Sequence, residues 1–107
     1  GHSALLALLD PNSPPSIDSL PTLKSVTGTK VIVLNTNQKG LGLQTGNLTQ
    51  FHDPSGNLAN ALRAPATPLY FLVDSKGRVE NVWYGFDRRH PEKFKDQVKS
   101  ALSERQG

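Results

Sequence analysis

Residues 4–16 read Ala-Leu-Leu-Ala-Leu-Leu-Asp-Pro-Asn-Ser-Pro-Pro-Ser, which predicts how the domain begins. Ala4–Leu9 is a continuous apolar run that stops at Asp10-Pro11-Asn12, which predicts a buried strand followed by a turn. Ser13-Pro14 is typical of a helix start, because serine is a preferred N-cap and proline a preferred first helical residue. We therefore expect a strand that passes directly into a helix.

The segment that follows predicts a βαβ unit. Apolar residues recur every third position in this helix and end before Gly28; they are Ile17, Leu20, Leu23 and Val26. Lys30–Thr36, with the sequence KVIVLNT, is apolar and β-branched, as expected of a central parallel strand. A strand, a helix and a second strand in this order predict parallel pairing with a crossover helix.

The second half of the chain predicts a hairpin and a final helix. Leu69–Asp74 and Arg78–Phe86 are rich in strand formers, and Ser-Lys-Gly between them predicts an antiparallel turn with Gly77 in the left-handed region. On the second strand Trp83 and Tyr84 alternate, so one should face the core and the other solvent. The final helix begins at His90-Pro91 and places one set of apolar residues on a single face: Phe94, Val98, Ala101 and Leu102.

The middle of the chain is harder to interpret. Residues 37–47 contain three glycines and no clear period, so we expect a loop there. Asn57 is a plausible cap for a short helix over Leu58–Leu62. Taken together, the chain is expected to be an α/β domain over residues 4–107, with a mixed sheet of about four strands flanked by helices as a three-layer sandwich.

Composition limits the function classes. A length of 107 residues suits one domain, and the formal net charge is +3. The six Lys/Arg and three Asp/Glu after Asp87 account for this whole excess, and their signs alternate as on a solvated helix face. These charges are not interleaved with an aromatic platform of the kind that single-stranded nucleic acid stacks on, so nucleic acid is not an expected partner. The longest apolar run, Ala4–Leu9, is far shorter than the roughly 20 residues of a membrane span, so we expect no membrane insertion.

The chain contains no cysteine and no methionine. The absence of cysteine excludes disulfides, thiolate metal sites and thiol catalysis in this molecule. Gly1-His2-Ser3 resembles a cloning scar or a trimmed boundary.

Two other kinds of site have little support. The glycines at 40, 42 and 46 follow a strand, but their spacing is not that of a dinucleotide-binding loop. The histidines at 2, 52 and 90 are scattered, so no metal site is expected, and no cofactor is expected either.

The constellation of motifs resembles the thioredoxin fold and, within it, the extracytoplasmic TlpA-type thiol-disulfide oxidoreductases. Asn12-Ser13-Pro14-Pro15-Ser16, followed by Leu20-Pro21, matches the place where that branch has Trp-Cys-Pro-Pro-Cys and a proline five residues later. Residues 66–74, Ala-Thr-Pro-Leu-Tyr-Phe-Leu-Val-Asp, look like the cis-proline segment that opens the third strand of such folds. Lys76-Gly77-Arg78-Val79 and Gly85 complete a resemblance that covers residues 4–105.

The sequence departs from the branch at four positions. Ser13 and Ser16 stand where both cysteines are expected, Asn12 replaces the tryptophan, and Ser19 lies where a glutamate often assists proton transfer. The paired serines around two retained prolines are typical of a deliberate Cys-to-Ser exchange, although a natural loss leaves the same sequence.

The resemblance implies a site and its partners. Ser13 takes the place of the nucleophile and Ser16 that of the resolving group, whereas Asn12, Pro14, Pro15, Thr67 and Pro68 are expected to contact substrate. The substrates would be thiols or disulfides of proteins or peptides. The resemblance also implies a monomer that acts outside the cytoplasm and is sometimes tethered to a membrane. Serine cannot replace cysteine in this chemistry, because an alkoxide is too basic and oxygen forms no stable disulfide analogue. The chain as it stands is therefore expected to be inactive.

Three alternatives remain open on sequence alone. Ser13 and Ser16 could simply cap and support the helix start. The chain could be a natural cysteine-free thioredoxin-like module that holds peptides or a partner protein beside Pro68. A peroxiredoxin-like remnant is disfavoured, because that group lacks a cis-proline in the matching place.

Overall fold

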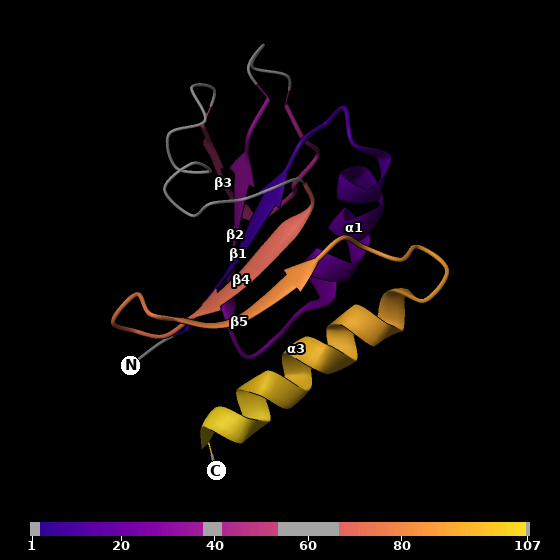
Figure 1. The fold of residues 1–107 in the computed structure, drawn as a ribbon. Coiled ribbons are helices and arrows are strands. Elements are labelled where there is room, and N and C mark those ends of the chain that lie inside the picture. The colour runs from indigo at the N-terminus through magenta and orange to yellow at the C-terminus, as the bar shows by residue number, and fades with distance from the viewer. Residues whose placement is uncertain (1–2, 38–41, 54–66, 107) are drawn as a thin grey trace.

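A computed structural model of the chain describes residues 3–37, 42–53 and 67–106. Its centre is a five-stranded sheet in the order β3-β2-β1-β4-β5 (Figure 1). β1 is parallel to β2, β2 is parallel to β3, and β4 is antiparallel to both β1 and β5. The strands are β1 (Ala4–Leu9), β2 (Lys30–Asn35), β3 (Thr49–His52), β4 (Leu69–Val73) and β5 (Val79–Tyr84).

The predicted βαβ unit is confirmed. β1 and β2 pair in parallel along their whole length, from Ala4 opposite Lys30 to Leu9 opposite Asn35. α1 (Pro14–Ser25) joins them, with Ser13 at the N-cap and prolines in its first two positions. The apolar run, the capping serine and the prolines therefore identify the strand, its end and the helix start from local sequence.

The predicted apolar face of α1 is wrong at its first member. Ile17 is 48% exposed, whereas Ser16, Ser19, Leu20 and Leu23 face the sheet and are buried. The intervals of three and four residues from Ser16 to Leu20 and Leu23 follow one helical stripe, and Ile17 lies to the side of it. Two serine hydroxyls are thus placed inside the protein, beneath the start of the helix.

β3 is a strand that the sequence did not predict. Its four residues, Thr-Gln-Phe-His, are half-buried or exposed and pair only with β2 at one edge of the sheet. A short edge strand needs little apolar alternation, so its sequence resembles a loop. Within residues 3–37, 42–53 and 67–106 the sheet consequently has five strands, where about four were expected.

The hairpin and the final helix are confirmed. β4 and β5 pair antiparallel, and the turn between them places Gly77 at φ +80°. α3 (Pro91–Gln106) buries Phe94, Val98 and Ala101, as its apolar face predicted. The helix expected over residues 58–62 lies outside the described residues.

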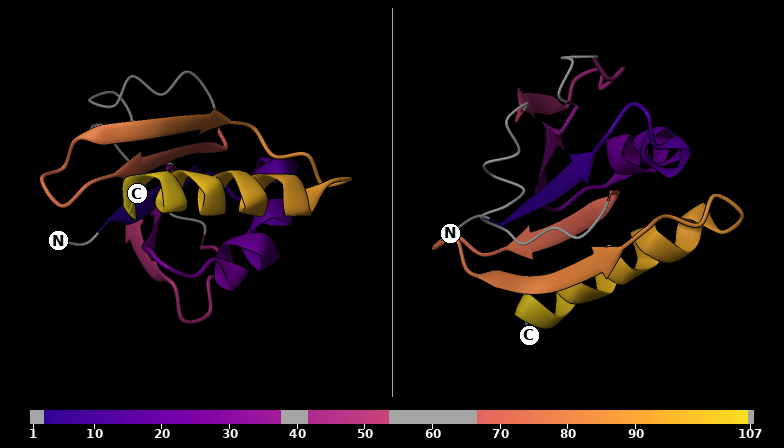
Figure 2. Two further views of the ribbon diagram at one scale, coloured as in Figure 1. Left: turned by 90° about the horizontal axis from the view of Figure 1, so that it is seen from below. Right: turned by 45° about the horizontal axis from the view of Figure 1, so that its top comes forward.

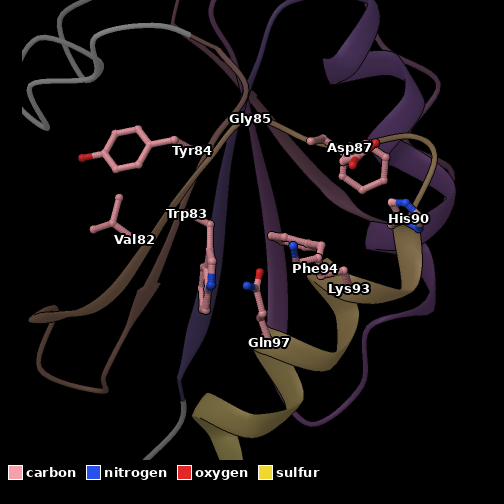
Figure 3. Close-up of a pocket in the computed structure, with 10 residues that line it drawn as sticks. Val82, Trp83, Tyr84, Gly85, Asp87, His90, Lys93, Phe94 and Gln97 are labelled. Atoms are coloured by element: carbon pink, nitrogen blue, oxygen red, sulfur yellow. The ribbon is translucent and has the colours of Figure 1, made fainter.

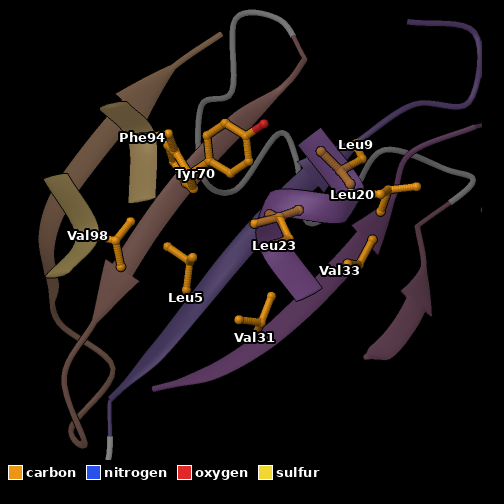
Figure 4. Packing of buried hydrophobic residues seen from close by; sticks show 10 residues of the cluster. Leu5, Leu9, Leu20, Leu23, Val31, Val33, Tyr70, Phe94 and Val98 are labelled. Atoms are coloured by element: carbon orange, nitrogen blue, oxygen red, sulfur yellow. The ribbon is translucent and has the colours of Figure 1, made fainter. Parts of the chain in front are cut away.

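The main core lies between the sheet and the two described helices. α1 and α3 cover the same side of the sheet (Figure 2). The residues of this cluster in Figure 4 come from β1, β2 and β4 and from both helices, and they include Leu5, Leu23, Val33, Tyr70 and Phe94. A second cluster on the opposite face contains Leu8, Leu34, Leu69 and Phe71. Both faces of the central strands are therefore apolar, as the unbroken Ala4–Leu9 run implied.

Candidate functional site

Strand register brings several chain segments to one edge of the sheet, namely the edge at which β1, β2 and β5 end and β4 begins. Leu8 pairs with Leu69, and Leu69 pairs with Tyr84, so the end of β1, the start of β4 and the end of β5 lie side by side. The end of the parallel strand β2 lies at the same edge. The β1–α1 junction and Thr67-Pro68 therefore flank this edge, which is where open α/β sheets commonly bind ligands.

Ser13 lies at the N-terminus of α1. Its backbone is extended, with φ −101° and ψ 108°, and its carbonyl accepts hydrogen bonds from the N–H groups of Ser16 at 2.9 Å and Ile17 at 3.3 Å. The Ser13 hydroxyl makes no capping hydrogen bond, and none joins it to a carboxylate or imidazole of a described residue. The residue is half-buried, so a side chain at this position reaches both the helix terminus and solvent.

Ser16 lies one turn further into the helix and is fully buried. Its Oγ accepts a hydrogen bond of 3.2 Å from the backbone N–H of Asp10, which ties the first turn of α1 back to the end of β1. Positions 13 and 16 thus differ in exposure although they belong to one motif. The half-buried position suits a group that meets a partner, and the buried position suits a group that acts only within the protein.

Two further hydroxyl side chains near Ser16 are buried, those of Ser19 and Tyr70. Ser19 donates a hydrogen bond of 2.8 Å to the carbonyl of Ser16. Tyr70, on β4, is fully buried, and its hydroxyl points in the direction of Leu9 and Leu20 (Figure 4). Burial raises the pKa of Tyr70 above its ordinary value of 10.0, and the nearby Ser19 hydroxyl offsets part of this rise. Since Tyr70 Oη has no partner of good hydrogen-bond geometry among the described residues, Ser19 lies near it without satisfying it.

The five expected substrate contacts lie around this edge with different exposures. Asn12, Pro14 and Pro15 are exposed, Thr67 is half-buried and Pro68 is buried. The Thr67–Pro68 peptide bond is cis, as expected. The carbonyl of Pro68 accepts a hydrogen bond of 2.9 Å from the N–H of Gly85, which fixes the end of β5 beside the start of β4.

Asp10 and Asn37 are two site residues that the sequence did not single out. Asp10 was interpreted only as part of a stop signal, yet its carboxylate accepts hydrogen bonds from the N–H of Asn12 at 2.9 Å and from Nδ2 of Asn37 at 3.1 Å. Asn37 is only 4% exposed, although its segment was predicted to be a loop, where an asparagine side chain is usually exposed. The available signal was their position directly after the two central strands.

The chemistry open to this arrangement follows from its groups. The N-terminus of α1 presents the positive end of the helix dipole to position 13, which favours an anion there. A serine without a neighbouring base does not become that anion near neutral pH. In the described part of the chain, no group of three or more His, Cys, Asp or Glu could hold a metal ion.

A separate cavity of about 560 Å³ lies between β5 and α3 (Figure 3). Trp83 and Phe94 form its apolar wall, with ring centroids 5.9 Å apart, and Lys93 and Gln97 border it from α3. In Figure 3 the side chains of Tyr84 and Val82 lie on the other side of β5 from that of Trp83, which confirms that Trp83 and Tyr84 face opposite sides of the strand. Tyr84 is 71% exposed.

Comparison with known proteins supports the fold alone. No family model matches the chain, and no curated protein matches it. Among solved structures, a Chlorobium tepidum protein assigned as a thiol:disulfide interchange protein DsbE superposes with a TM-score of 0.77 at 20% identity, over 95% of this chain and 81% of that one. The exposed lipoprotein thioredoxin of Streptococcus pneumoniae gives 0.73 at 21% identity, over 97% and 85%.

A secreted Mycobacterium tuberculosis disulfide oxidoreductase homologous to Escherichia coli DsbE gives a TM-score of 0.68 at 16% identity, over 95% of this chain and 81% of that one. The agreement extends over nearly the whole chain in each case. The protein therefore has the thioredoxin-like fold of thiol-disulfide oxidoreductases, and it has this fold without a single cysteine.

Proposed function

We propose that this chain is a thiol-disulfide oxidoreductase domain, spanning residues 4–107, in which Ser13 and Ser16 occupy the positions of the two active-site cysteines. The observation that carries the proposal is the contrast between a half-buried residue at the helix N-terminus and a fully buried one in the first turn. Disulfide exchange needs an accessible nucleophile and a sheltered resolving thiol at this spacing. With serine at both positions the chain is redox-inactive.

In the cysteine form the reaction runs in two steps. The thiolate at position 13 attacks one sulfur of a substrate disulfide, forms a mixed disulfide and expels the first substrate thiolate. The thiolate at position 16 then attacks the sulfur at position 13, closes the protein disulfide and releases the second substrate thiolate. The substrate gains two electrons and the protein loses two, and the reverse sequence oxidises a dithiol.

The neighbouring residues are assigned to substrate contact. Pro14 and Pro15 are exposed beside position 13, and together with Asn12 they form the rim that an incoming peptide meets first. Thr67 and Pro68 lie at the start of β4, where an extended peptide can pair with the backbone by strand addition. Proteins and peptides are therefore the proposed substrate class.

The test restores both thiols as Ser13→Cys/Ser16→Cys. This variant should reduce insulin in the presence of dithiothreitol and exchange with glutathione, whereas the unaltered chain should do neither. Ser13→Cys alone should form a stable mixed disulfide with glutathione, because the resolving group is missing. Ser100→Cys, on the exposed surface of α3, is the matched control for a thiol outside the site.

The result that contradicts the proposal is a well-folded double variant with no more exchange activity than the Ser100→Cys control. Circular dichroism and the unfolding midpoint establish folding independently of activity.

A second function, peptide binding by a natural cysteine-free module, is supported by the apolar surface around Ser13. Ile17 is 48% exposed beside the exposed Pro14 and Pro15. This function predicts chemical-shift changes confined to residues 12–16 and 66–69 when a peptide is added to the unaltered chain. Binding by the serine form together with an inactive double variant would favour it over the first proposal.

We further propose that the domain acts outside the cytoplasm as a monomer. Two of the similar structures are described as an exposed lipoprotein and a secreted protein, which supports this location. No helix among the described residues is long and apolar enough to cross a bilayer. Localisation of the full-length gene product and native mass spectrometry of the chain test the two statements.

A further inference from the structure

Asp10 contacts three members of the Asn12–Ser16 motif through three different groups. Its carbonyl accepts a hydrogen bond of 2.8 Å from the N–H of Ser13. Its carboxylate Oδ1 accepts one of 2.9 Å from the N–H of Asn12, and its own N–H donates one of 3.2 Å to Oγ of Ser16. One half-buried residue at the end of β1 thus holds both serine positions and the turn before them.

A chain of buried amides holds Asp10 from behind. Asn37 donates a hydrogen bond of 3.1 Å from Nδ2 to the same Oδ1, and its N–H donates one of 3.0 Å to Oδ1 of Asn35. Nδ2 of Asn35 donates to Oε1 of Gln50 at 3.1 Å, and Nε2 of Gln50 donates to the Leu43 carbonyl at 3.3 Å. Asn35 and Asn37 are 0% and 4% exposed, so these two amides of the network are shielded from water.

Asp10 also places a negative charge beside the helix terminus. The first turn of α1 carries no acidic residue of its own. The Asp10 carboxylate, which lies outside the helix, therefore offsets part of the positive potential that the helix dipole produces at position 13. The other titratable groups of this region are Asp18 on α1, His52 and Asp53 at the end of β3, and Tyr70 on β4. The Asp10 carboxylate is joined directly to the motif by the hydrogen bond of 2.9 Å from the N–H of Asn12.

We propose that Asp10 is a positioning residue of this site, which holds Asn12, Ser13 and Ser16 in place and disfavours an anion at position 13 through its charge. The inference rests on the proposed function, because it predicts the direction in which the cysteine form exchanges disulfides. A nearby carboxylate makes a thiolate less stable. A site whose thiolate is less stable is a weaker oxidant and a better reductant. The cysteine form is accordingly assigned to the reducing direction.

The charge is tested in the Ser13→Cys variant, whose thiol pKa is measured from the pH dependence of alkylation by iodoacetamide. Asp10→Asn keeps the Oδ1 acceptor and removes the charge, so it should lower the thiol pKa by about one unit, which is a ~10-fold larger thiolate fraction below the pKa. Asp96→Asn, on the exposed surface of α3, removes the same charge far from the turn and should leave the pKa unchanged. Equal pKa values in the Asp10→Asn and Asp96→Asn variants would overturn the charge assignment.

The positioning is tested by amide hydrogen exchange in the unaltered chain. Asp10→Ala removes the acceptor, so the N–H of Asn12 and the side-chain amide of Asn37 should exchange at least ~10-fold faster, while Asp10→Asn should retain their protection. Unchanged protection in Asp10→Ala would overturn the positioning role. If Asp10→Ala does not fold, Asp10→Leu is measured instead, and unchanged protection there would overturn the positioning role. Neither measurement depends on exchange activity, so the outcome is separable from that of the cysteine-restored variant.

Discussion

The backbone N–H of Asp10 donates a hydrogen bond of 3.2 Å to Oγ of Ser16, across the turn between β1 and α1. Ser16 is fully buried, so this hydroxyl is the local substitute for the water that the N–H would otherwise bind. The serine therefore has a structural role in the chain as it stands, separate from any role of the residue it replaces.

Ser16→Ala should lower the free energy of unfolding by about 1–2 kcal/mol, because it leaves the N–H of Asp10 without its acceptor. Urea unfolding followed by circular dichroism measures the change. Ser25→Ala is the matched control: Ser25 bonds the Thr22 carbonyl at 2.7 Å in an exposed position, where water can replace it. A loss no larger than that of the control would show that the Asp10–Ser16 hydrogen bond adds nothing to stability.

Tyr70→Phe tests whether the buried phenol has an unseen partner. Its hydroxyl is unsatisfied within the described structure, whereas its ring packs on Phe94 with centroids 4.5 Å apart. Removing only the hydroxyl should leave stability within about 1 kcal/mol or raise it, while Tyr70→Ala should cost about 3–5 kcal/mol. Urea unfolding of both variants separates the ring from the hydroxyl. A loss of more than about 2 kcal/mol in Tyr70→Phe would reveal a buried water or side chain bonded to it.

The raised pKa of Tyr70 predicts an alkaline loss of stability. At a pH below 10.0, the ordinary pKa of tyrosine, Tyr70 keeps its proton in both the folded and the unfolded chain, so its full contribution to the free energy of unfolding is present. Above this pH the unfolded chain releases the proton while the folded chain keeps it, so stability falls by up to about 1.4 kcal/mol per pH unit until the folded pKa is reached. Tyr70→Phe should flatten this slope in urea titrations, and Tyr84→Phe, at an exposed position, is the control. Equal slopes in the two variants would contradict the assignment.

These residues show what a single sequence can and cannot reveal. β1, α1, β2, the hairpin and α3 follow from apolar runs, caps and turn residues, all of which act within a few positions of the chain. β3 was missed because its pairing with β2 supplies the order that Thr-Gln-Phe-His does not encode locally.

The Asn12–Ser16 and Thr67-Pro68 segments could be located in advance because their spacing resembles a known motif. The supporting residues could not, because Asp10, Asn37 and Tyr70 matter through hydrogen bonds and burial that join separate strands. Ile17 was misplaced for the same reason, since tertiary packing turned Ser16 and Ser19 inward and left the isoleucine half-exposed.

The hairpin turn offers an acid-side prediction. Asp74 accepts hydrogen bonds of 2.9 Å from the N–H groups of Arg78 and Lys76 and from Nε of Arg78. The Arg78 backbone N–H is the main cause of the lowered pKa of Asp74. Its stabilising contribution is therefore complete above the ordinary aspartate pKa and is lost as the pH falls through the lowered folded value. Asp74→Asn should lower the melting temperature at neutral pH and lessen its fall below about pH 4, relative to Asp96→Asn. Parallel acid-side curves for the two variants would count against this assignment.

Ser13→Ala tests whether Ser13 stabilises the protein as a helix cap or has no such role. Serine at an N-cap usually contributes about 1 kcal/mol through its side-chain hydrogen bond. The Ser13 hydroxyl makes no such bond, because Pro15 has no N–H at the second helical position and the N–H of Ser16 at the third donates to the Ser13 carbonyl. The substitution should therefore change the free energy of unfolding by less than about 0.5 kcal/mol, measured by urea unfolding beside Ser103→Ala, an exposed control on α3. A loss near 1 kcal/mol would instead show that Ser13 is retained as a cap. A negligible loss leaves the hydroxyl without a structural task at the position where the cysteine form needs its nucleophile.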